Sequence, residues 1–219
     1  MEDPALGPKT PEHEIAYRRL REMVLLGQLA PGQGVTIHGI ARALGAGQTP
    51  VREAIRRLTA EGALVLQENR RVTVPRLHLA QIDELALARQ ALEPELARRA
   101  AARAGQAALA ERLATLDAQV DEAIAAADVG CYLTANARFH FTLYEAAGAP
   151  ILLSLVGALW LRVGPSLRVM METGGPSGPD RHRETVAALR AERPDAVARA
   201  IGEDIEQGLS RLRAALAGT

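Results

Sequence analysis

The sequence predicts a mostly α-helical protein, with an N-terminal winged helix-turn-helix followed by an all-α antiparallel bundle of helices. Ala, Leu and Arg dominate the 219 residues, while aromatic side chains make up 3%. These three residues lose little conformational freedom in a helix, so the composition favours helices over sheets. Glycine and proline breaks then divide the chain into short helices near its start and longer helices after residue 78.

The N-terminal third contains three predicted helices and a hairpin. Apolar residues recur at helical spacing over 13–26 and again over 37–44, and the segment GQLAPGQG separates the two helices. Thr49 is the expected N-cap of a third helix, because Pro50 follows it as the first helical residue. The β-prone segments ALVLQ and RVTVP come next and predict a small hairpin.

Six more helices are predicted downstream, separated by glycine and proline breaks. They span residues 80–104, 107–128, 130–147, 150–171, 180–192 and 195–217. We therefore expect three parts: a loose tail over 1–12, a winged helix-turn-helix domain over 13–77, and a helical domain over 78–219.

Several features indicate a cytoplasmic protein without a membrane segment. The single cysteine, Cys131, has no partner for an intramolecular disulfide, which agrees with a reducing compartment. The start MEDPALGPKTPEHE lacks the basic and apolar regions of a signal peptide. No stretch reaches the roughly 18 unbroken apolar residues that a membrane span needs.

Positive charge is concentrated in the predicted N-terminal domain. The net charge of the chain is zero, yet residues 13–77 hold ten arginines against five glutamates. Residues 78–219 hold 15 arginines against 18 acidic residues. A surface that attracts phosphates is therefore expected only in the first domain.

The third predicted helix and the hairpin tip hold polar and basic side chains suited to DNA. A helix that enters the major groove presents side chains near its start to the base edges, and basic residues nearby contact phosphates. A solvent-exposed basic face is the alternative interpretation. The candidate DNA contacts are Gln48, Thr49, Arg52, Arg56, Arg70 and Arg71.

The N-terminal segment also resembles a known family. LLGQLAPGQGVTIHGIARALG followed by TPVREAIRRLTAEGAL is similar to the winged-helix domain of the GntR family, which implies binding to double-stranded DNA with a palindromic operator. By this resemblance, Gln48, Thr49, Arg52 and the wing residues near Arg70 match the family's DNA contacts. Family members usually have Ser-Arg before the Thr-Pro and a glycine in the wing. This chain has Gly47-Gln48 and Arg71 there.

The second part resembles the ligand-sensing FCD domain of the FadR-like branch of that family. The similar segments are LARQALEPELARRAA, NARFHFTLYEAAG, ALWLRVGP and HRETVAALRAERPDAVARAIGEDI. The resemblance implies a repressor of catabolic genes that a metabolite releases from DNA. A palindromic operator further requires two winged helices, so we expect a homodimer.

Four residues of the helical domain form a candidate metal site. Asn136 and His140 lie four apart on one predicted helix, so they share a face. His182 and Asp204 are each eleven residues from Arg193, which lies at a turn, so they face each other in an antiparallel pair of helices. Such pairs of N and O ligands suit a divalent metal in a helix bundle, although a histidine taken alone is more often an ordinary polar residue.

The resemblance agrees with this metal site only in part. Metal-binding FCD domains usually carry one Asp and three His at the matching positions, so His140 and His182 agree while Asn136 and Asp204 depart. Asn is a weaker, neutral ligand, and the expected ions are Zn²⁺, Ni²⁺ or Mn²⁺.

Arg89 is the candidate effector-binding residue. The FCD pattern places an arginine facing the ligand pocket at this position, where a guanidinium binds a carboxylate at two points. The implied effector is a small organic acid. The alternative is a surface salt bridge with Glu93, four residues further along the helix.

Two other functions compete with that of a ligand-responsive regulator. A metal-dependent enzyme would use His140, His182 and Asp204 to activate water, but no general base is evident beside them and the basic first domain stays unexplained. A sensor of the metal ion itself is the second alternative. We therefore expect no enzymatic activity, and an acid or a metal as the effector.

The Gln48 departure predicts an altered operator preference. Glutamine hydrogen-bonds adenine in the major groove, whereas arginine hydrogen-bonds guanine. We expect Gln48→Arg to change the preferred base at one position of each half-site from adenine to guanine in a binding-site selection. An unchanged preference would show that Gln48 does not contact that base.

Overall fold

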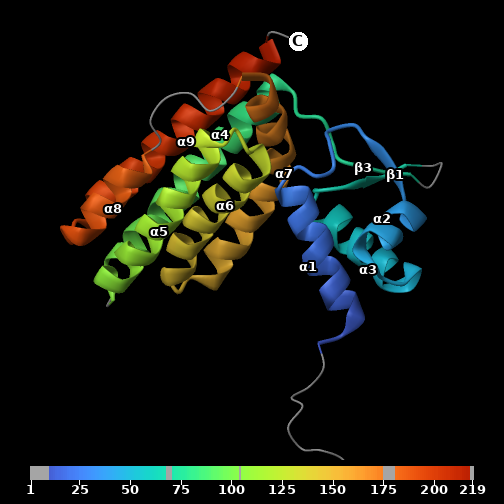
Figure 1. The fold of residues 1–219 in the computed structure, drawn as a ribbon, viewed down its shortest axis with the longest axis horizontal. Helices are drawn as coiled ribbons and strands as arrows, with labels where there is room; N and C mark the ends of the chain where they lie inside the picture. Colours follow the sequence, from blue (N-terminus) through green and yellow to red (C-terminus); the bar gives the residue numbers. More distant parts are fainter. Residues whose placement is uncertain (1–9, 68–70, 104, 175–180, 218–219) are drawn as a thin grey trace, which may run out of the picture.

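The computed structural model describes residues 10–67, 71–103, 105–174 and 181–217. It consists of helices and one small sheet, arranged in two adjoining parts (Figure 1). The first three helices and the sheet lie on one side, and the helices from α4 onward form a bundle on the other. The fold class is therefore confirmed as a winged helix-turn-helix joined to an antiparallel helical bundle.

The N-terminal part packs three helices around one apolar core. They are α1 (Glu12–Leu25), α2 (Ile37–Leu44) and α3 (Gln48–Ala60). Leu20 of α1 and Leu58 of α3 are fully buried where these two helices pack together. Ile40 of α2 is buried in the same core. The Thr36 side chain accepts a hydrogen bond from the Gly39 amide at 3.0 Å and so caps α2.

The wing is a three-stranded antiparallel sheet. It comprises β1 (Gly34–Thr36), β2 (Val65–Leu66) and β3 (Arg71–Thr73), in the order β1-β3-β2. The predicted hairpin corresponds to β2 and β3. The prediction missed β1, because a three-residue strand beside the GQLAPGQG breaker is too short to show alternation and is held by its pairing with β3.

The predicted N-cap of α3 was wrong. The helix begins at Gln48, and Gly47 is the N-cap, with extended backbone angles and without a side-chain hydrogen bond. Thr49 and Pro50 both lie inside the first turn. Proline is tolerated there because the amides of the first turn have no intrahelical acceptor.

The bundle contains the six predicted long helices, with ends that differ by a few residues. They are α4 (Leu79–Ala101), α5 (Gln106–Ala125), α6 (Val129–Ala146), α7 (Pro150–Gly174), α8 (His182–Arg190) and α9 (Pro194–Ala217). Helix α4 packs along α9, while α5 packs between α6 and α8. Phe139, Leu143 and Tyr144 of α6 are fully buried at the centre of this core.

Helix α7 joins the two parts of the protein. It contacts α1 on one side and α4, α6 and α9 on the other (Figure 1). Leu161 of α7 is buried in the core of the winged domain, and Leu26, which follows α1, is buried in the core of the bundle. By length and a mean hydropathy of 1.5, Pro150–Glu172 also meets the criteria for a membrane span, as core helices of soluble proteins often do.

The contact between α1 and α7 is close enough to exclude a side chain. A Cβ added to Gly164 would overlap the carbonyl oxygen of Leu25. Close by, Arg162 donates a hydrogen bond of 3.2 Å to the carbonyl of Glu61, the C-cap of α3. The two parts are thus joined through backbone as well as side-chain contacts.

We expect the same substitution to have opposite effects at two helical glycines. Gly164→Ala forces α7 away from the Leu25 carbonyl and should lower the free energy of unfolding by about 1–3 kcal/mol. Gly208→Ala on α9 meets no atom within 4 Å, so it should raise that free energy by about 0.5–1 kcal/mol. Urea unfolding measures both values. Equal effects would contradict the close approach of α1 and α7.

Candidate effector pocket and metal centre

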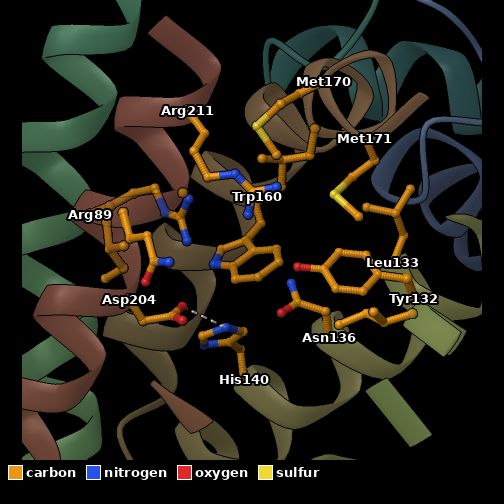
Figure 2. Close-up of a pocket in the computed structure, with 15 residues that line it drawn as sticks. Arg89, Tyr132, Leu133, Asn136, His140, Trp160, Met170, Met171, Asp204 and Arg211 are labelled. Carbon is orange, nitrogen blue, oxygen red and sulfur yellow. Dashed lines mark ion pairs between the residues drawn. The ribbon is translucent and has the colours of Figure 1, made fainter. Parts of the chain in front are cut away.

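A pocket of about 70 Å³ lies inside the bundle, among α4, α5, α6, α7 and α9. A single water needs about 10–15 Å³ of such volume, so the pocket has room for a small ligand. Figure 2 shows several polar side chains that converge beside the Trp160 ring. The polar lining residues are Arg89, Tyr132, Asn136, His140, Asp204, Gln207 and Arg211, and the larger apolar ones are Ile124, Leu133, Trp160, Leu167, Met170, Met171 and Ile205.

A fully buried carboxylate, Glu93, binds three side chains around this pocket. Its Oε1 accepts a hydrogen bond of 2.5 Å from Nε of Arg89, and its Oε2 accepts bonds from Arg89 (3.2 Å), Tyr144 (2.6 Å) and Trp160 (3.1 Å). The Arg89 guanidinium also lies 4.7 Å from the centre of the Trp160 ring. The predicted pair of Arg89 with Glu93 therefore forms, but it is buried and not at the surface.

The protonation states of this cluster follow from its burial and from the charge of Glu93. Burial disfavours the charged form of Arg89, but the charge and hydrogen bonds of Glu93 outweigh it and raise the pKa of Arg89. Burial, followed by the charge and hydrogen bond of Glu93, raises the pKa of Tyr144 well above its usual value. Arg89 is therefore charged and Tyr144 is a neutral hydrogen-bond donor.

Tyr144 in turn orients His140. Its hydroxyl lies 3.1 Å from Nδ1 of His140, and since the hydroxyl proton is directed to Glu93, its oxygen accepts the proton on Nδ1. This leaves a lone pair on Nε2 of His140, which is the usual form of a histidine ligand. That Nε2 lies 3.3 Å from Oδ2 of Asp204 and 3.4 Å from Nε2 of His182.

His182 is held in a comparable way. Its fully buried ring stacks on Phe139, with the ring centres 3.8 Å apart. Oδ1 of the buried Asp117 lies 3.4 Å from Nδ1 of His182. The two atoms lack hydrogen-bond geometry, but the negative charge of a carboxylate at this distance favours a proton on that nitrogen. Nε2 of His182 is therefore also an acceptor, directed at His140.

Three electron-pair donors thus converge and fit a divalent metal ion. The ligand atoms of His140, His182 and Asp204 lie within 4.8 Å of one another. Metal bonds of about 2.0–2.1 Å place neighbouring ligands about 3.0–3.4 Å apart, which agrees with the two separations around Nε2 of His140. Two nitrogen lone pairs that face each other beside a carboxylate repel unless a cation lies between them.

Asp204 is held as a charged carboxylate. Before an ion binds, burial raises its pKa, but a proton on Nε2 of His140, hydrogen-bonded to the carboxylate, and the charges of His140 and His182 outweigh this effect, so the pKa lies well below the usual value. A bound cation would take the place of that proton between Nε2 and the carboxylate. The backbone amide of Arg181 donates a further bond of 3.3 Å to Oδ1. A charged carboxylate is the form that a metal binds.

Asn136 lies one turn before His140 on α6, and both line the pocket. Figure 2 shows its amide directed into the pocket beside His140. Of the four candidate ligands, Asn136, His140 and Asp204 line the pocket, while His182 lies behind His140.

Some residues of this site were missed by sequence reasoning. Tyr144 follows His140 by four residues, so its place on the same face of α6 was available as a signal. Arg211 follows Asp204 by seven residues, so its place on the same face of α9 was available in the same way. Asp117 comes from α5, whose packing against α8 had to be known first, and no local spacing indicates it.

The candidate DNA contacts lie mostly on one exposed face. Val51 and Ile55 bury the opposite face of α3 in the winged-domain core. Arg57, next to Arg56, instead turns toward α1, where it binds Glu14 at 2.8 Å. Arg70 lies outside the described residues. The exposed candidates are Gln48, Thr49, Arg52, Arg56 and Arg71.

A winged helix-turn-helix with exposed arginines, joined to a bundle with an internal pocket, defines a DNA-binding transcription regulator. Residues 13–74 match the family model for bacterial regulatory proteins of the gntR family, and residues 84–207 match the model for the FCD domain. The chain therefore belongs to the GntR family and carries a C-terminal FCD domain.

Curated relatives and solved structures agree with this assignment. The HTH-type transcriptional regulator McbR of Escherichia coli strain K12 is 29% identical over 197 residues, covering 88% of this chain and 89% of McbR. The structure of E. coli McbR/YncC matches with a TM-score of 0.86 and 27% identity, over 93% of this chain and 98% of that chain. The HTH-type transcriptional repressor RspR of the same strain is 31% identical over 96 residues, 44% of this chain and 42% of RspR. These relatives are named as transcription regulators, not as enzymes.

Glu93→Gln should strongly destabilise the protein. The substitution leaves the buried Arg89 charge without its counterion, which costs about 3–5 kcal/mol of unfolding free energy. Glu95→Gln is the matched control, because Glu95 pairs with Arg98 and Arg99 at the surface and should change the free energy by less than about 1 kcal/mol. Urea unfolding that gives similar values for the two variants would contradict the role of Glu93.

Proposed function

We propose that the protein is a homodimeric, cytoplasmic repressor controlled by a small organic acid. In this proposal residues 13–77 bind a palindromic operator, and residues 78–219 bind the acid and a divalent metal. The observation that carries it is the convergence of Arg89, His140 and Asp204 on one pocket within the bundle. The name of RspR as a repressor supports the sign of the response.

The metal would be held by His140, His182 and Asp204, with Asn136 as a further, weaker ligand. Zn²⁺, Ni²⁺ and Mn²⁺ all accept such nitrogen and oxygen ligands. When bound, the ion supplies positive charge and an open coordination position for one carboxylate oxygen of the acid. Asp117 and Tyr144 keep the histidine rings oriented toward the ion.

Arg89 would bind the carboxylate of the acid through the edge of its guanidinium that faces the pocket. Glu93 occupies Nε and one bond of Nη2, so the acid approaches from the Nη1 side. Because Arg89 is already held by Glu93 and Trp160, little side-chain freedom is lost on binding.

Occupancy of the pocket would reach the DNA-binding part through α7. Trp160 lines the pocket, the next residue is buried in the winged-domain core, and Arg162 binds the C-terminal end of α3. A small displacement of α7 therefore changes the position of α3. In a dimer, this alters the spacing of the two recognition helices and hence the fit to the operator.

A sensor of the metal ion itself is the second candidate, favoured by the metal-like spacing of His140, His182 and Asp204. In that case operator affinity follows metal concentration with no acid present. The acid is favoured because Arg89 and the pocket lie directly beside the candidate metal centre.

We expect one metal ion per chain in protein purified without chelators. His140→Ala should remove it, because two ligands that remain hold an ion weakly. His38→Ala is the matched control, since His38 is exposed on α2 and should leave the metal content unchanged. Elemental analysis of both variants measures the result.

Small carboxylic acids should then raise the melting temperature of the metal-loaded protein, because a ligand that binds only the native state stabilises it. Arg89→Lys should abolish the increase while retaining the metal. Protein with neither metal nor any response to acids would contradict the proposed effector site and leave the assignment as a DNA-binding regulator intact.

A further inference from the structure

One face of α9 forms a wall of the pocket beyond the metal centre. Asp204, Gln207, Gly208 and Arg211 all line the pocket, and their spacing places them on the same side of the helix. Asp204 and Arg211 are separated by about two turns, or roughly 10 Å along the axis. The pocket therefore extends from Asp204 toward a second charged residue.

Between these two residues the wall of the pocket is formed in part by a glycine, Gly208. Glycine inside a helix costs about 1 kcal/mol relative to alanine, so each such glycine calls for a structural reason. At Gly202, also on α9, a Cβ would come within 3.2 Å of Oε1 of Gln90, so close packing against α4 explains it. At Gly208 a Cβ would meet nothing within 4 Å, so packing does not explain it, whereas the room it leaves in the pocket does.

Charge at this end of the pocket favours an anion. Among the described residues that line the pocket, Asp204 is the one carboxylate. Two guanidinium groups, those of Arg89 and Arg211, thus line a pocket with one carboxylate, and Figure 2 shows Arg211 extended toward Trp160.

We infer that Arg211 and Gly208 form a second anion subsite, so that the effector is an elongated acid with an anionic group at each end, such as a short dicarboxylate. One carboxylate lies at Arg89 and His140, and the other at Arg211. Gly208 leaves room for the chain between them, against Trp160 and Leu167. This inference rests on the proposed acid-binding function of the same pocket.

The test compares dicarboxylates with monocarboxylates of equal length. Succinate, glutarate and adipate are titrated alongside butyrate, pentanoate and hexanoate, and Trp160 fluorescence reports binding because it is the single tryptophan of the chain. The wild type should bind the best dicarboxylate about tenfold or more tightly than its monocarboxylate counterpart, as expected for one charged hydrogen-bonding contact.

Two variants separate the subsite from the rest of the pocket. Arg211→Met keeps most of the length of the side chain but removes its charge. It should reduce the ratio of dicarboxylate to monocarboxylate affinity to nearly one, while the affinity for monocarboxylates stays within about twofold of the wild-type value. Gly208→Leu fills the space and should abolish binding of the dicarboxylates without lowering the melting temperature. Gly208→Ala is the control that retains most of the space.

The outcomes distinguish this inference from the proposed function. If monocarboxylates and dicarboxylates bind the wild type equally and Arg211→Met changes neither, the second subsite is wrong and the acid-binding function stands. If none of the acids binds the wild type, both are overturned. If Gly208→Leu binds dicarboxylates normally while remaining folded, the assigned position of the acid is wrong.

Discussion

The organisation of the bundle depends on the buried carboxylate of Glu93. An isolated charge at this depth would be very unfavourable, so it requires the donors that Arg89, Tyr144 and Trp160 supply. Through its bonds to these three residues, one side chain orients the cation of the pocket, the hydroxyl that determines the tautomer of His140, and the indole that forms part of the pocket wall. The same network therefore contributes to the stability of the core and to the chemistry of the candidate site.

The position of Trp160 connects this network to the other half of the molecule. Residues 160, 161 and 162 follow one another on α7, and they contact the pocket, the winged-domain core and the end of α3 respectively. Close packing of Gly164 on the backbone of α1 leaves little room for α7 to move independently. Consecutive residues of one helix therefore contact both the pocket and the DNA-binding part, as the proposed control by a ligand requires.

Local patterns predicted the helices and part of the site, and tertiary contacts determined the rest. The hydrophobic period and the glycine and proline breaks located all the long helices, and the four-residue spacing placed Asn136 and His140 on one face. The cap at Thr49 was wrong because Gly47 adopts the required extended conformation without a side-chain bond. Asp117 reaches His182 only because α5 packs against α8, and no local period of the sequence records such packing.

The most direct test of this account is whether the acid and the operator affect each other's binding. The affinity for the acid, followed by Trp160 fluorescence, is measured with and without saturating operator DNA, and the affinity for the operator with and without the acid. Linkage requires both affinities to change by the same factor, about 5- to 150-fold for typical coupled sites. We predict such a reciprocal change, which Arg162→Ala reduces because it removes the bond from α7 to the end of α3. An acid affinity that is the same with and without operator DNA would contradict the coupling of the two parts through α7.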